Sequence, residues 1–171
     1  MKLTAKTVKA FHLPRWKELP ALALYMDQLV IVLQETIGLF VDEKEPVVTR
    51  SMVNNYVKQK LISPPEKKKY GRNHLAALIV VNLLKRVFSM SEITEVIRVM
   101  IDVYGMEASY NMFCDRFEGS MQSAFLGESE ALITVKSAGD PVQIALDAGI
   151  AAFIGKLLVV DFLERAKEKE E

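Results

Sequence analysis

The chain has 171 residues, of which 50% are apolar and 26% are charged, enough for one domain with an ordinary hydrophobic core. It contains a single cysteine, Cys114, so a disulfide within the chain is excluded and a cysteine-based metal site is disfavoured. The net charge is zero, which excludes a chain that is basic throughout.

The N-terminal region predicts a loop followed by a helix. Residues 1–20 are basic, and we expect them to be irregular, with Trp16 packing back onto the body from a proline-bracketed loop. They lack a continuous apolar core, so we expect no signal peptide. Residues 21–37 place apolar side chains at helical spacing and predict a helix that stops at Gly38.

A second, shorter helix is predicted from Thr49, a favourable N-cap residue, to about Gln59. One of its faces is apolar and must dock on a core. The opposite face is polar and consists of Ser51, Asn54, Asn55 and Lys58. Such side chains read base edges in the major groove of DNA, and a face that only meets solvent is the alternative.

The segment from Leu61 to Tyr70 is predicted to be a short extended hairpin or loop, because Pro64 and Pro65 exclude a helix. Residues 47–75 have a net charge of +6, and the rest of the chain has −6. A basic stretch in an acidic body suits a surface that faces phosphates, whereas a solvated lysine-rich turn is the alternative. The basic residues of interest here are Arg50, Lys67, Lys68, Lys69 and Arg72.

The middle of the chain predicts two consecutive helices. His74 to Val87 is apolar on nearly all sides, which indicates a central, buried helix. Ser89 and Glu92 have the spacing of a capping box, and we expect the helix that they start to run to about Tyr104.

Two C-terminal helices are predicted at Glu107–Phe125 and Pro141–Arg165, joined by a loop with room for a short strand at Ala131–Val135. The apolar stretch 142–163 contains three charged residues, so we interpret it as a buried helix and expect no membrane span and a cytoplasmic protein. Small residues four apart along it suit either a dimer seam or close internal packing. These pairs are Ala145/Gly149, Ala148/Ala152 and Ala151/Gly155.

The order of these segments resembles the head of MerR-type regulators. The matching stretch runs from Met52 to Ile62, continues through Pro64, Tyr70 and Arg72, and ends in the turn from Phe88 to Ile93. This resemblance implies a mainly all-α fold, with a winged helix-turn-helix head, a small β-hairpin wing and C-terminal helices. We divide the chain accordingly into residues 1–105, the N-terminal helix and head, and residues 106–171, a region for dimerisation or an effector.

The sequence departs from the MerR pattern in and after the predicted recognition helix. Asn54 and Asn55 stand where the family has arginine and tyrosine, and Lys60 stands where it has glycine. A lysine in a left-handed conformation costs about 1 kcal/mol.

The chain is also similar, over roughly residues 11–110, to an uncharacterised bacterial family of domain-of-unknown-function proteins. The stretches that carry this similarity are 13–16, 24–28 and 49–59. It implies the same winged-helix expectation and supplies no activity.

No set of residues predicts catalysis, a metal or a cofactor. His12 and His74 lack acidic neighbours at ligand or triad spacing, and no glycine-rich phosphate loop occurs. We expect His74 to be structural or capping and Cys114 to be an inert core thiol. Methionines 90, 100, 106, 112 and 121 are either core residues or the lining of an adaptable effector pocket.

We therefore expect a non-catalytic, homodimeric regulator that binds double-stranded DNA. The helix 49–59 would contact bases through its polar face, and the wing 62–72, with Arg50, would hold phosphates. The alternative is a protein-interaction module that keeps the fold without DNA binding. A small-molecule effector is compatible with either.

Overall fold

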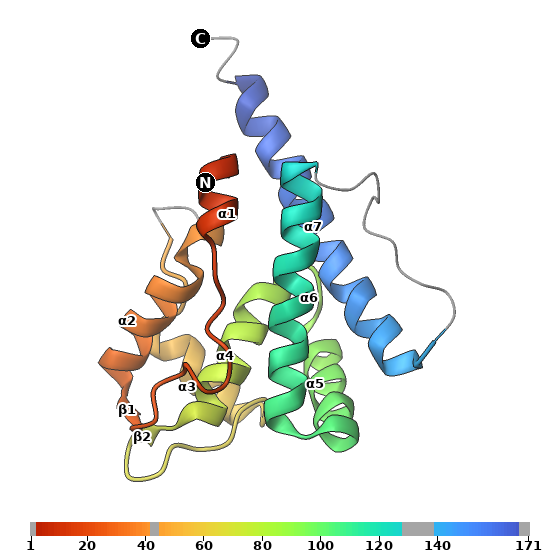
Figure 1. Ribbon diagram of the computed structural model, residues 1–171. Coiled ribbons are helices and arrows are strands. Elements are labelled where there is room, and N and C mark those ends of the chain that lie inside the picture. The colour runs from red at the N-terminus through yellow and green to blue at the C-terminus, as the bar shows by residue number, and fades with distance from the viewer. Residues whose placement is uncertain (1–2, 42–44, 128–138, 168–171) are drawn as a thin grey trace.

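The computed structural model describes residues 3–41, 45–127 and 139–167, which are mostly helical with one small antiparallel sheet (Figure 1). The expected all-α class is confirmed at this level. The elements are α1 (Ala5–Ala10), β1 (Leu24–Tyr25), α2 (Met26–Ile37), η1 (Gly38–Phe40), α3 (Arg50–Lys58), β2 (Lys69–Tyr70), α4 (Arg72–Leu84), α5 (Met90–Tyr104), α6 (Met106–Leu126) and α7 (Pro141–Lys167).

The expectation that residues 1–20 are irregular is wrong for residues 5–10, which form α1. Thr4 caps this helix, because its hydroxyl accepts from the N–H of Thr7 at 3.1 Å while the Thr7 hydroxyl accepts from the N–H of Thr4 at 2.9 Å. This reciprocal capping stabilises a helix of one and a half turns that its apolar content alone does not predict. The loop that follows behaves as expected, since Trp16 packs against the core.

The predicted helix 21–37 begins later than expected, at Met26. The side chain of Gln28 accepts from the backbone N–H of Tyr25 at 2.9 Å, which fixes the first turn there. Residues 24 and 25 instead form β1, and Leu22 before them is 83% exposed. The apolar pattern of residues 21–37 therefore begins several residues before the helix that the structure contains.

The strand β1 pairs with β2, with Leu24 opposite Tyr70 and Tyr25 opposite Lys69. The expected hairpin within residues 61–70 is thus only a single bridge between Glu66 and Lys69. Proline has no N–H to donate to a strand ladder, so Pro64 and Pro65 prevent a longer pairing there.

The remaining helices lie within about three residues of their predicted bounds, and the expected helix 74–87 differs most, since it begins at Arg72 and ends at Leu84. Ser89 and Glu92 cap α5 reciprocally, and α5 ends at Tyr104, before Gly105, whose φ is 79°. The strand expected at residues 131–135 lies outside the described residues. No helix of the described part of the chain is both long enough and apolar enough to span a membrane.

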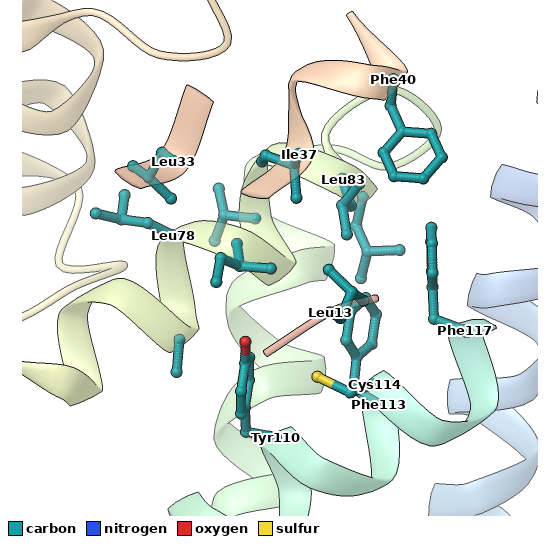
Figure 2. Close-up of a cluster of buried hydrophobic side chains, with 14 of the residues drawn as sticks. Leu13, Leu33, Ile37, Phe40, Leu78, Leu83, Tyr110, Phe113, Cys114 and Phe117 are labelled. Atoms are coloured by element: carbon teal, nitrogen blue, oxygen red, sulfur yellow. The ribbon is translucent and has the colours of Figure 1, made fainter. Parts of the chain in front are cut away.

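One hydrophobic cluster joins all of the helices, and α4 lies near its centre (Figure 2). The ring of Phe117 on α6 lies 5.5 Å, between centroids, from the rings of both Phe40 and Phe153. The contact with Phe40 is edge-to-face, and aromatic contacts of this kind add to the stabilisation that burial provides. The cluster crosses the expected boundary at residue 105, which itself stays a prediction.

The segment that follows α1 is held to α6 by a partly buried ion pair. The guanidinium of Arg15 donates to both carboxylate oxygens of Glu118, at 2.8 and 2.7 Å, and to Asp115 at 2.9 Å. The backbone N–H of Leu13 also donates to Glu118. The backbone N–H of Trp16 donates to the side-chain oxygen of Asn111 at 2.8 Å. The N-terminal segment is therefore fixed to α6 by specific polar contacts.

We expect Glu118→Gln to lower the free energy of unfolding by about 1–3 kcal/mol at neutral pH, because it removes the negative charge of the more buried of the two carboxylates that contact Arg15. Burial alone would raise the pKa of Glu118, but the hydrogen bonds from Arg15 and Leu13 outweigh it and hold the pKa below its usual value. The contribution of the ionised Glu118 to the free energy of unfolding is fully present above the unfolded-state pKa of this carboxyl. It is lost as the pH falls through the folded-state pKa. Urea unfolding at neutral and acidic pH measures the difference.

Asp115→Asn is the matched control for this ion pair. Asp115 contacts the same guanidinium, but its side chain is 67% exposed, against 14% for Glu118. We expect it to change stability by less than about 1 kcal/mol. Equal losses for the two variants would contradict the assignment.

Candidate nucleic-acid interface

Helix α3 has the two faces that its sequence predicts. Its N-cap is Thr49, whose hydroxyl accepts from the N–H of Met52 at 3.1 Å. Val53 and Tyr56 are buried against the core. The opposite face is exposed and consists of Ser51, Asn54, Asn55 and Lys58. Four polar side chains are thus presented together on one capped helix.

The end of α3 is a tight turn built on Lys60, whose φ is 58°. The N–H of Lys60 donates to the carbonyl of Val57, and the N–H of Leu61 donates to that of Tyr56, both at 3.0 Å. This is the hydrogen-bond pattern of a Schellman motif, with Leu61 and Tyr56 buried together. The position that the sequence flagged is therefore left-handed.

The tip of the basic segment is a two-residue turn. Glu66 and Lys69 exchange two backbone hydrogen bonds, of 3.1 and 2.8 Å. Lys67 and Lys68 between them have φ values of 48° and 65°, the left-handed conformation at both central residues that a type I′ turn requires. Both lysines are exposed. The turn therefore projects two adjacent positive charges from a fixed backbone.

Three of the cations that the sequence selected are engaged within the molecule. Arg50 forms an ion pair with Asp27 at the start of α2. The ammonium of Lys69 lies 4.9 Å from the centroid of the Tyr25 ring.

Arg72 is the most enclosed of the three. It donates to the carbonyl of Leu19 at 3.1 Å, and its guanidinium lies 5.8 Å from the centroid of the Trp16 ring. Its placement favours a structural role over a contact with phosphate. In contrast, the following exposed lysines form no ion pair with any residue that the structure describes: Lys58, Lys60, Lys67 and Lys68.

The sequence missed the polar group that supports α3 from behind. Lys85, just after α4, points its ammonium at the side chain of Asn82 (2.6 Å), the carbonyl of Val47 (3.3 Å) and the hydroxyl of Tyr56 (3.5 Å). Asn82 is buried and donates in turn to the carbonyl of Leu78 at 2.7 Å. These contacts join the end of α4 to the segment before α3, at Val47, and to the last turn of α3, at Tyr56. The lysine within an otherwise apolar helix was the signal for them.

The other residues that the sequence singled out have structural placements. His74 accepts from the N–H of Gly71 at 3.0 Å and so caps α4. Cys114 is fully buried, and burial raises the pKa of its thiol to about 12. No cluster of three potential metal-ligating side chains occurs among the residues that the structure describes.

An apolar cavity lies between α4, α5 and α6. Met100 and Met106 line it, together with Val80, Ile97 and Phe113. Its polar neighbours are already paired, since Ser109 donates to the carbonyl of Met100 and Tyr110 donates to that of Pro14. The cavity thus offers apolar contact without a spare polar handle.

Together, the fold and the site define a small, mainly helical protein with a polar helix and a basic turn near one end. The family model described as Domain of unknown function (DUF1836) matches residues 14–113, and the chain belongs to this family. No curated protein and no solved structure matches the chain. The similarity to a domain-of-unknown-function family is thus confirmed, and the MerR-type head stays a prediction.

We expect Lys60→Gly to raise the free energy of unfolding by about 0.5–1 kcal/mol, because glycine adopts the left-handed conformation without the steric cost that lysine incurs. Urea unfolding measures the change. Lys58→Gly is the control, since it places glycine in the last turn of the same helix and should lower stability by up to about 1 kcal/mol. A loss of stability in Lys60→Gly would contradict the inference that the backbone of Lys60 is strained.

Lys85 should make stability rise with pH. Burial, followed by the charge of Arg86, lowers its pKa to about 8. Between this value and the higher unfolded-state pKa, the unfolded chain binds one more proton than the folded chain, so stability increases with pH. We expect a gain of about 1 kcal/mol between pH 7 and pH 9, measured by urea unfolding, and expect Lys85→Met to lack it. The same pH dependence in both proteins would contradict this assignment.

Proposed function

We propose that this protein binds double-stranded DNA as a non-catalytic regulator with a MerR-like head. The observation that carries the proposal is the exposed polar face of α3, together with the basic turn of fixed geometry that follows it in the chain. Side-chain amides and lysines read base edges, and cations at a second contact hold the backbone. In Figure 1, α3, β1 and β2 lie at the lower left, away from α7.

The likeness to a MerR head rests on the order and contacts of the elements. Helices α2 and α3 precede the basic turn, α4 follows it, and a capping box begins α5. The β1–β2 pairing attaches the end of the turn to the start of α2. The turn would then act as a wing whose position relative to α3 is set by α2 and α4.

Different residues would have different tasks in such a complex. Asn54 and Asn55 would contact base edges, with asparagine best suited to adenine. Ser51 and Lys58 would flank them on the same face. Lys67 and Lys68 would hold phosphates. By contrast, Lys69 and Arg72 would position the wing through their aromatic contacts, and Arg50 would reach DNA only by leaving Asp27.

We expect the double variant Lys67→Ala/Lys68→Ala to weaken binding to duplexes selected from a random pool by roughly tenfold or more at moderate salt. It should also reduce the slope of log affinity against log salt by about 2, because each phosphate contact contributes about 1. Asn54→Ala/Asn55→Ala should instead reduce discrimination between sequences. Gel shift or fluorescence anisotropy across a salt series distinguishes the two effects.

Lys6→Ala/Lys167→Ala is the control of equal charge. Both of these lysines are exposed, and they lie on α1 and at the end of α7, at the opposite end of the molecule in Figure 1. Their removal should leave the affinity nearly unchanged. No binding by the wild type even at low salt, or equal losses in both double variants, would refute the proposal.

A protein-interaction role is the second candidate. It is favoured by the intramolecular contacts of Arg50, Lys69 and Arg72, which reduce the charge offered to a polyanion, and by the net charge of zero. The same Lys67 and Lys68 would then meet an acidic protein segment. A random duplex pool from which nothing is selected, together with binding to an acidic peptide library that depends on these lysines, would support this candidate.

A further inference from the structure

The outer face of α7 carries large apolar side chains that nothing in the described chain covers. Val159, Phe162 and Leu163 are 58%, 68% and 52% exposed. The opposite face of the same helix is buried and includes Ile150, Phe153 and Leu157. An exposed cluster of this kind on a helix that already has a complete buried face marks an interaction surface.

The first half of the same outer face is lined by small residues. Ala145, Ala148 and Ala152 are exposed. A Cβ added at Gly155 would meet no atom within 4 Å, whereas one at Gly149 would lie 3.6 Å from the ring of Phe88. A distance of 3.6 Å is an ordinary contact, so packing within the described chain does not require the absence of a side chain at either Gly149 or Gly155.

A cleft of about 230 Å³ lies beside the small end of this face. Its walls come from α5, through Val96 and Val99, and from the start of α7, through Val142 and Ala145. Val103, one turn after Val99, is 54% exposed and extends the apolar wall. The outer face of α7 thus has bulky side chains at one end and a hollow with small residues at the other.

The two ends complement each other in one arrangement. If two copies of α7 pack antiparallel around a two-fold axis near Gly155, Phe162 of each copy lies opposite Ala148 of the other. Val159 then lies opposite the alanines at 151 and 152, and Leu163 lies next to Ala145 and its cleft. Gly155 meets its own symmetry mate, where small residues allow the closest approach of two helices. A parallel arrangement would instead oppose Phe162 to Phe162.

We propose that the occupant of this face is a second copy of the chain, packed antiparallel through α7. An isologous pair buries both bulky ends in both hollows, and so closes without leaving a free apolar end. Charge supports the same direction, because Lys167 at the end of one α7 approaches Asp140, which precedes the start of the other. Antiparallel helix dipoles are also mutually favourable. This inference does not depend on DNA binding, and its test contains no DNA.

Light scattering on the full chain should give twice the mass of 19.3 kDa at micromolar concentration. Phe162→Glu should raise the dissociation constant of the dimer by roughly 100-fold or more, because each interface contains the residue twice. The control is Ile31→Glu on α2, since Ile31 is 57% exposed and lies away from α7. It should leave the dimer intact. A monomeric wild type, or equal dissociation in both variants, would overturn the proposal.

Engineered cysteines test the direction of the pair. Gly155→Cys lies at the proposed axis and should form a disulfide-linked dimer under mild oxidation, whereas Phe162→Cys alone should not. The double variant Ala148→Cys/Phe162→Cys should be linked. The buried Cys114 is the internal reference and should remain reduced in all three proteins. Linkage of Phe162→Cys alone would indicate a parallel seam and refute the arrangement, as would the absence of linkage at Gly155→Cys.

Discussion

The burial of α4 on nearly all of its faces is the constraint on which the rest of this structure depends. A helix that is apolar all round must be covered on every side, and α2 with β2 covers one side while α5, α6 and α7 cover the others. The polar groups at its two ends then have fixed positions. At its start, His74 holds Gly71 and contacts Ser63, at the two ends of the basic turn. At its end, Lys85 reaches Val47, which precedes α3, and Tyr56 in the last turn of α3. One buried helix thus positions both parts of the proposed interface.

A second contact connects that interface to α7. Phe40, at the end of η1, packs its ring against Phe117 on α6 and Phe153 on α7, with centroid separations of 5.5 and 5.8 Å. The core therefore continues from the element that precedes α3 to the buried face of the last helix. A dimer formed through the outer face of α7 would consequently hold two α3 helices at a fixed separation. The proposals about DNA and about self-association are independent in their tests but are joined by this packing.

Local signals in the sequence predicted most of the helices, and contacts distant in sequence explain what it missed. Thr49, Ser89 and Glu92 act on the nearest turn, so their spacing alone indicates where α3 and α5 begin. The partners of Arg50 and Arg72, by contrast, are Asp27 and Trp16, which lie far from them in the sequence and meet them only in the folded chain. The pairing of β1 with β2 is also distant in sequence. It explains why Leu24 and Tyr25 form a strand although the apolar pattern of residues 21–37 predicts a helix. Pro64 and Pro65 exclude a helix, as the sequence predicts, and their missing N–H groups also limit the hairpin to a single bridge.

The distribution of backbone strain bears on why the turn is basic. Among the described residues, the non-glycine positions with positive φ are Lys60, Lys67 and Lys68, all within nine residues of one another. Glycine or asparagine would adopt these conformations more readily, and lysine costs about 1 kcal/mol at each. The lysine side chains themselves supply no compensating contact, because they are exposed and form no ion pair with the described part of the chain. What lysine provides there, and glycine does not, is a positive charge at a fixed point on the surface. Strain retained for that purpose favours a negatively charged partner at this turn over a solvated loop.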